Sequence, residues 1–145
     1  MSSNLHHIGE FQFVDGETVE TSELIDLYKS VGCTAYATKP ELVAQLLTNS
    51  LYYRVARYKS KLVGLIRVVG DGVSIVYVQD LRVHPNYQDC GFGKSLLNHI
   101  LEKYKEVRPV VSLTDGLEST RLSYEACSLR NLNDCKLSAY IRCPW

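Results

Sequence analysis

The sequence predicts a single α/β (α+β) domain built on one sheet of mixed strand direction, and three observations support this. The chain has 145 residues, which suits one domain and is too short for two. Two β-rich runs, residues 51–58 and 62–69, flank a short turn and form an antiparallel hairpin. A strand, a long helix and another strand follow over residues 73–114, and this order predicts parallel strands joined by a right-handed crossover.

The composition is that of a globular protein without a dominant charge. Hydrophobic residues make up 46% and charged residues 22% of the chain. Sixteen Lys and Arg balance sixteen Asp and Glu, so no basic field favours nucleic acid or a membrane as a partner. The five cysteines are odd in number and contain no C-x-x-C pair, which predicts free thiols in a reducing compartment and no metal site. The first residues show no basic region followed by an apolar stretch, so we expect a cytoplasmic protein.

Hydrophobic periodicity places the other elements. The run 73–83 has apolar residues at both odd- and even-numbered positions, that is, on both faces of a strand. This pattern predicts a central strand covered on both faces, in the middle of the sheet. The apolar stripe that begins at Phe92 predicts a long amphipathic helix. The remaining predicted elements are strands over 10–14, 107–114 and 135–142 and helices over 21–32, 40–50 and 117–127.

The segment from Gln88 to Ser95 lies between a predicted strand and the start of the long helix. Its two glycines allow backbone N–H groups to converge on an anion, and the helix N-terminus adds partial positive charge. The alternative is a tight turn without a ligand. Two phosphate-binding patterns do not fit, because the P-loop requires glycine in place of Gln88 and the dinucleotide pattern requires glycine in place of Leu96.

A third pattern, Gln-x-x-Gly-x-Gly after a strand that ends in Val-x-Pro, fits Val83-His84-Pro85 and Gln88 to Gly93. Here the sequence resembles the GNAT superfamily of N-acetyltransferases. The resemblance covers nearly the whole chain, because the predicted elements follow the order of that fold. It implies one N-acetyltransferase domain over residues 1–145, with a mostly antiparallel sheet, about four flanking helices and a splayed parallel strand pair.

The resemblance also implies a binding site for acetyl-CoA, as co-substrate, in the cleft between the splayed strands. Backbone groups of Leu81, Arg82 and Val83 would pair with the pantetheine amides, like an added strand. Tyr124 would lie beside the thioester sulfur, unless it is a packing tyrosine. The residues that would hold the pyrophosphate are Gln88, Asp89, Cys90, Gly91, Phe92, Gly93, Lys94 and Ser95.

The expected reaction is direct attack of a primary amine on the thioester in a ternary complex. At pH 7 only about 1 in 2,500 lysine-like amines is neutral, so a base or a water wire must assist. Asp80 and Asp115 are the candidate bases, and for each the alternative is a solvated or structural carboxylate. The Tyr124 hydroxyl would assist departure of the thiolate through a hydrogen bond. The alternatives for the whole chain are a catalytically silent acyl-CoA-binding module and an enzyme for a longer acyl chain.

The acceptor is expected to be a small-molecule, polyamine-like, peptide or protein amine, and the protein a monomer or homodimer. Residues 1–28 contain six acids and no Lys or Arg. In the family the early helices border the acceptor cleft, so an acidic rim there would suit a cationic amine, whereas the alternative is solvated surface. Two segments depart from the family pattern. Asp89 and Cys90 stand where basic residues are common, and Ser128-Leu129 replaces the usual Gly-Phe.

Overall fold

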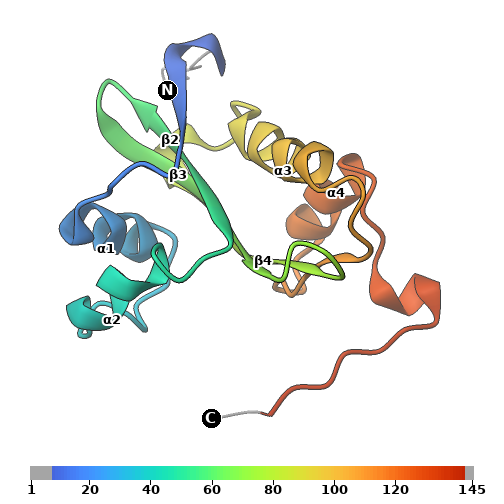
Figure 1. Cartoon of the computed structure of the whole chain (residues 1–145). Helices are drawn as coiled ribbons and strands as arrows, with labels where there is room; N and C mark the ends of the chain where they lie inside the picture. Colours follow the sequence, from blue (N-terminus) through green and yellow to red (C-terminus); the bar gives the residue numbers. More distant parts are fainter. Residues whose placement is uncertain (1–7, 143–145) are drawn as a thin grey trace. The chain divides into compact units, whose positions relative to one another are not determined.

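The computed structural model describes residues 8–142, which form two compact units divided between Leu113 and Thr114. The first unit contains a five-stranded sheet in the order β1-β2-β3-β4-β5 (Figure 1). Neighbouring strands are antiparallel except for β4 and β5, which are parallel. The strands are β1 (Phe11–Asp15), β2 (Tyr52–Tyr58), β3 (Lys61–Gly70), β4 (Val76–Val83) and β5 (Val110–Ser112). The predicted mixed sheet and its hairpin are confirmed.

Helices cover both faces of this sheet. Helices α1 (Thr21–Ser30) and α2 (Pro40–Leu46) lie on one side, and α3 (Phe92–Lys103) lies on the other (Figure 1). Two short 3-10 helices, η1 (Ile8–Glu10) and η2 (Pro85–Tyr87), precede β1 and follow β4. The first unit therefore has three layers, with one apolar core on each side of the sheet.

The core on the α1 and α2 side forms around Leu24, Leu27 and Tyr28 of α1 and Val55 and Leu65 of the hairpin. On the other side, α3 buries four side chains, which are Phe92, Leu96, Leu97 and Ile100. Phe92 packs directly over Gly64 of β3, where any Cβ atom would collide with the ring. Glycine is therefore required at this position, and its absence of a side chain lets the first turn of α3 rest on the sheet.

The central strand differs from the prediction. We expected residues 73–83 in the middle of the sheet, but β3 is the third of the five strands and is buried from Leu62 to Val68. The reason is that β1 pairs with the outer side of β2, which moves the second hairpin strand to the centre. The strand predicted over 107–114 is also shorter, because β5 contains only Val110–Ser112 and begins after Pro109, which has no N–H for a ladder.

The second unit contains α4 (Glu118–Ala126) and the 3-10 helix η3 (Leu132–Cys135). The strand predicted over 135–142 is wrong, since no regular structure follows η3 in the described residues. Lys136 has a left-handed backbone with φ 57°, which turns the chain out of an extended path. The apolar side chains beyond it are exposed, with Tyr140 at 95% and Ile141 at 63%. No buried face therefore holds this segment as a strand.

Within the described residues, none of the helices combines the length and apolar character needed to span a membrane.

Candidate functional site

Strand β4 has an open edge beyond its first three residues. β5 pairs with Val76, Tyr77 and Val78 only, whereas β3 continues to pair with β4 up to Val83. A bulge occurs at the point of separation, because consecutive residues of β3 pair with Val78 and Asp80 and leave Gln79 as an extra residue. The backbone on the β5 side of residues 79–83 therefore has no strand partner among the described residues. An extended ligand can pair with such an edge.

The start of α3 follows this open segment and forms a cradle of amide groups. Gly91 is the N-cap, with a left-handed φ of 84°, and no side chain caps the helix. The first bond of the helical ladder runs from Ser95 N to Gly91 O, so the amides of Phe92, Gly93 and Lys94 have no partner within the helix. A Cβ atom on Gly91 would meet no atom within 4 Å. The amides and the helix dipole together suit an anion such as a pyrophosphate.

The cradle is attached to the end of β4. The Gln88 side chain donates an Nε2 hydrogen bond of 3.2 Å to the carbonyl of Val83. A Cβ atom on Gly93 would lie 3.1 Å from Cγ2 of Val83, so α3 approaches β4 closely at this glycine. Leu81 and Val83 therefore face α3, and the intervening Arg82 faces the side of α1, because side chains alternate along a strand.

The predicted pyrophosphate residues do not all present side chains to the cradle. Phe92 is fully buried in the core. Asp89 and Lys94 are exposed, and Asp89 has a left-handed φ of 64°. The thiol of Cys90 lies 3.6 Å from the carbonyl of Gln88. A binding role for these residues therefore depends mainly on their backbone amides, and it stays a prediction.

Asp80 of β4 is the centre of a buried polar cluster on the α1 side of the sheet. Its side chain is 3% exposed. Oδ2 accepts hydrogen bonds of 2.8 Å from the Tyr28 hydroxyl and 2.8 Å from Arg67 Nε. Oδ1 accepts a 3.3 Å bond from Arg82 Nε and lies 3.1 Å from Arg82 Nη2. Burial, together with the adjacent Asp80 carboxylate, raises the pKa of Tyr28, which keeps its hydroxyl a donor. Because both oxygens of Asp80 are occupied, these contacts favour its structural alternative, and its role as a base stays a prediction.

The predicted site included Asp80 and Arg82 of this cluster but not Tyr28 or Arg67, although the sequence carries a signal for Arg67 in β3. Arg67 is the one charged residue in the apolar run from Leu62 to Val69. A buried arginine requires a buried anion, and Asp80 of the next predicted strand provides it.

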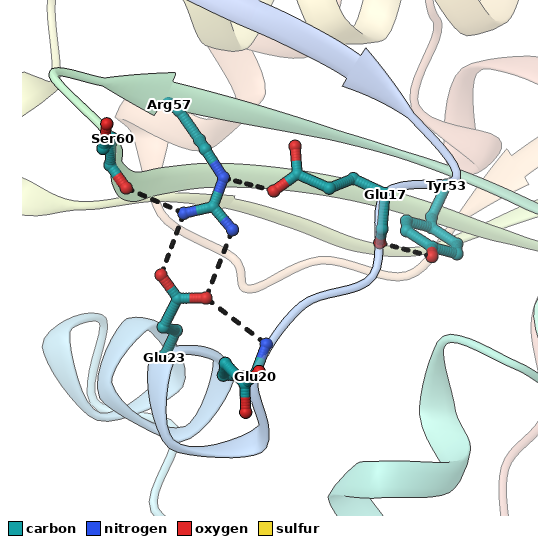
Figure 2. A network of polar contacts seen from close by, with 6 residues as sticks. All are labelled: Glu17, Glu20, Glu23, Tyr53, Arg57 and Ser60. Atoms are coloured by element: carbon teal, nitrogen blue, oxygen red, sulfur yellow. Dashed lines mark hydrogen bonds and ion pairs between the residues drawn. The ribbon is translucent and has the colours of Figure 1, made fainter.

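Three of the six acids near the N-terminus pair with arginines of the hairpin, and Figure 2 shows the two that pair with Arg57. Arg57 forms a two-pronged ion pair with Glu23, through Nη1 to Oε1 at 2.9 Å and Nη2 to Oε2 at 3.2 Å. Its Nε also pairs with Glu17, and Arg54 pairs with Asp15 at 3.4 Å. The hydrogen bonds to Arg57 lower the pKa of Glu23.

These ion pairs change the prediction of an acidic rim around the acceptor cleft. Asp15, Glu17 and Glu23 are neutralised locally by the hairpin, because β1 and the segment before α1 lie along β2. The sequence showed the acids but not their pairing with Arg54 and Arg57. The rim therefore offers a cationic amine fewer free carboxylates than the six acids suggested.

Tyr124 and Asp115 belong to the second unit. Tyr124 is half-buried on α4. Asp115 is exposed, and its Oδ1 accepts a 3.0 Å bond from the amide of Leu117 just before α4. Both proposed roles, at the thioester sulfur and as a base, stay predictions.

The comparison with protein families decides the membership of this chain. Residues 21–122 match the family model described as "Acetyltransferase (GNAT) family". The chain belongs to this family. The matched residues extend from the start of α1 into α4 and include the open edge of β4 and the α3 cradle. The resemblance stated from Gln88 to Gly93 is confirmed.

Individual relatives agree with this GNAT membership. A GNAT-family acetyltransferase from Streptococcus pneumoniae has a similar structure, with a TM-score of 0.82 and 34% identity over 92% of this chain and 97% of that one. An uncharacterised N-acetyltransferase from Prochlorococcus marinus is 32% identical over 66% of this chain. The chain spans about half the length of this curated relative, at 54%. The fold is also similar to that of the aminoglycoside N-acetyltransferase AAC(6')-Iy, solved in complex with CoA, with a TM-score of 0.68, 12% identity and coverage of 93% and 94% of the two chains.

Proposed function

We propose that this GNAT protein is an N-acetyltransferase that moves an acetyl group from acetyl-CoA to a primary amine within a ternary complex. The observation that carries the proposal is the cradle at Gly91, where free amides of α3 lie directly after the open edge of β4. Both units are proposed to form one catalytic domain. The family match and the CoA complex of a protein with this fold support acyl-CoA as the donor.

The cradle at the start of α3 and the open edge of β4 suit different regions of acetyl-CoA. The amides of residues 92–94 would bind the pyrophosphate, since they point outward from a helix N-terminus without a cap. The backbone of Leu81, Arg82 and Val83 would pair with the pantetheine arm as an additional strand. Such pairing would hold the thioester near the separation of β4 from β5 and orient it for attack.

The reaction then needs a base for the amine proton and a stabilising contact for the departing thiolate. The amine nitrogen attacks the thioester carbonyl, the carbon–sulfur bond breaks, and CoA leaves as a thiolate. The Tyr124 hydroxyl is proposed to stabilise that thiolate by a hydrogen bond, because a phenol is a weaker acid than a thiol by about 1.5 pKa units. The amine proton passes to Asp80, to Asp115 or to water. The contacts of Asp80 described above favour Asp115 or water over Asp80.

The decisive experiment compares two substitutions at Gly91. Gly91→Asp and Gly91→Asn have nearly the same shape, and both residue types tolerate a left-handed backbone, so the pair isolates charge in the cradle. We expect calorimetry to show clearly weaker acetyl-CoA binding for Gly91→Asp than for Gly91→Asn. Gly93 is less suitable, because its Cβ atom would press on Val83.

Equal affinities in these two folded variants would reject the cradle. Release of CoA thiol is then followed with the wild-type chain and a panel of primary amines. Acetyl-CoA binding without turnover of any amine would indicate a silent binding module, and competition by longer acyl-CoAs would indicate another acyl donor.

A further inference from the structure

Arg82 carries a positive charge that the surrounding cluster does not balance. Asp80 pairs with two arginines, Arg67 at 2.8 Å and Arg82 at 3.1 Å. One carboxylate cannot neutralise two guanidinium groups, so the cluster has an excess charge of +1. The Arg67 side chain is only 6% exposed, whereas that of Arg82 is 34% exposed. The excess charge is therefore presented to solvent at Arg82, for which Asp80 is the single ion-pair partner among residues 8–142.

The position of Arg82 is suited to an acceptor. It lies in the stretch of β4 that β5 does not accompany. Its side chain is on the α1 side of the sheet, because the neighbouring Val83 packs toward Gly93 of α3 on the other side. The α3 cradle and the Arg82 side chain thus lie on opposite sides of the same open segment. A donor held along the edge and the cradle leaves the α1 side for a second substrate.

The guanidinium of Arg82 has one edge already oriented and another edge free. Nε donates a 3.3 Å hydrogen bond to Oδ1 of Asp80, and Nη2 lies 3.1 Å from the same oxygen as an ion pair. A guanidinium has N–H groups on two edges, so the edge formed by Nη1 and Nη2 keeps its donors. Asp80 is itself held by Tyr28 and Arg67. This arrangement fixes the plane of Arg82, and a planar carboxylate is the anion that matches the free edge with two parallel bonds.

We propose that Arg82 binds a carboxylate of the acceptor, so that the substrate is an amine that also carries a carboxylate group, as an amino acid does. This inference rests on the proposed acetyl transfer and defines its acceptor class. The paired state of Asp15, Glu17 and Glu23 agrees with it, because these acids are occupied by Arg54 and Arg57 instead of facing a cationic amine.

The first test measures acceptor preference. L-Amino acids and their carboxamides are compared by CoA thiol release at saturating acetyl-CoA. For the wild type, kcat/KM should be roughly 10- to 100-fold higher for the amino acid than for its carboxamide. This ratio corresponds to the binding energy of one charge-assisted hydrogen-bonded pair. Arg82→Gln should remove most of this preference, and Arg82→Lys should retain part of it. Amidation also changes the amine pKa, so the quantity compared is the change in preference between wild type and variant.

A matched control is Lys105→Gln, which removes an exposed cation after α3 whose partner is Glu102. It should keep the wild-type preference. If Arg82→Gln prefers the amino acids over their carboxamides as strongly as the wild type does, the proposal is overturned.

The second test does not depend on turnover. In the CoA-loaded, 15N-labelled protein, the Nε–Hε signal of Arg82 is assigned by its loss in Arg82→Gln. Addition of the amino acids should shift this signal, and addition of the amides should not. A signal that no amino acid moves overturns the proposal even when acetyl transfer is active. If the protein neither binds nor turns over acetyl-CoA, but the Arg82 signal still shifts when amino acids are added, the proposed function is overturned instead.

Discussion

The hydroxyl of Tyr28 on α1 donates a 2.8 Å hydrogen bond to the carboxylate of Asp80 on β4, 52 residues along the chain. The same oxygen accepts from Nε of Arg67 on β3. One buried carboxylate therefore joins a helix on the α1 side of the sheet to two adjacent strands. Removal of this group would affect the fold and the site together, so its two roles must be separated by design.

Asp80→Asn should destabilise the protein by about 3–5 kcal/mol, because it leaves the buried Arg67 without a counter-ion. Arg67→Met in the same chain removes that orphan charge and should restore much of the loss in urea unfolding. Turnover of the double variant then tests the base. With an amine that lacks a carboxylate, and therefore does not need Arg82, a fall of roughly 10²–10⁴-fold below wild type would support proton transfer to Asp80, whereas near-normal turnover would reject it.

Glu23→Gln should reduce stability at neutral pH by about 1 kcal/mol, since Glu23 is partly exposed and bonded to Arg57. Arg57 holds the pKa of Glu23 below its ordinary value of 4.5. The stabilisation of the folded protein by the Glu23–Arg57 pair is therefore complete above pH 4.5. It disappears as the pH falls through the lower pKa that Glu23 has in the folded protein. Urea unfolding across this acid range should show the two proteins converging at low pH.

Glu41→Gln is the matched control for this acid-range experiment, because Glu41 is exposed on α2 and forms no ion pair among the described residues. A constant difference between Glu23→Gln and wild type at every pH would contradict the assignment.

Asp89→Asn should tighten acetyl-CoA binding roughly two- to fivefold at low salt if the carboxylate faces the pyrophosphate. Asparagine retains the left-handed backbone with φ 64°, whereas arginine would add strain at this position. Calorimetry at rising salt should show the gain shrinking, because screening weakens exposed charges. Glu106→Gln removes an exposed acid after α3 and should have little effect. Unchanged or weaker binding by Asp89→Asn would mean that its side chain points away.

Tyr124→Phe should lower turnover by roughly 10²–10⁴-fold and leave acetyl-CoA affinity nearly constant, because only the hydroxyl is removed. Single-turnover measurement is required, since slow product release would hide a change in chemistry. Tyr140→Phe, at a tyrosine that is 95% exposed, is the control. Near-wild-type single turnover by Tyr124→Phe would assign this tyrosine to packing.

Local chemistry made much of the fold predictable. The turn between residues 58 and 62, the apolar stripe of α3 and the proline at the start of α2 are short-range signals, and the structure confirms each element. The cradle was predictable for the same reason, because Gly91 and Gly93 specify a helix start that few other residues allow. The exit from α4 was less predictable, since Ser128 adopts the left-handed φ of 67° that glycine usually occupies.

By itself, then, the sequence determined most of the elements, the mixed sheet and the glycines at the start of α3, because periodicity and turn chemistry act over a few residues. Only the tertiary structure decided which strand is central, that residues 136–142 form no strand, and which charges meet. Arg57 is 34 residues from Glu23, and Arg67 is 13 residues from Asp80. Pairing of such charges depends on sheet register and helix packing, which set distances that no local pattern contains.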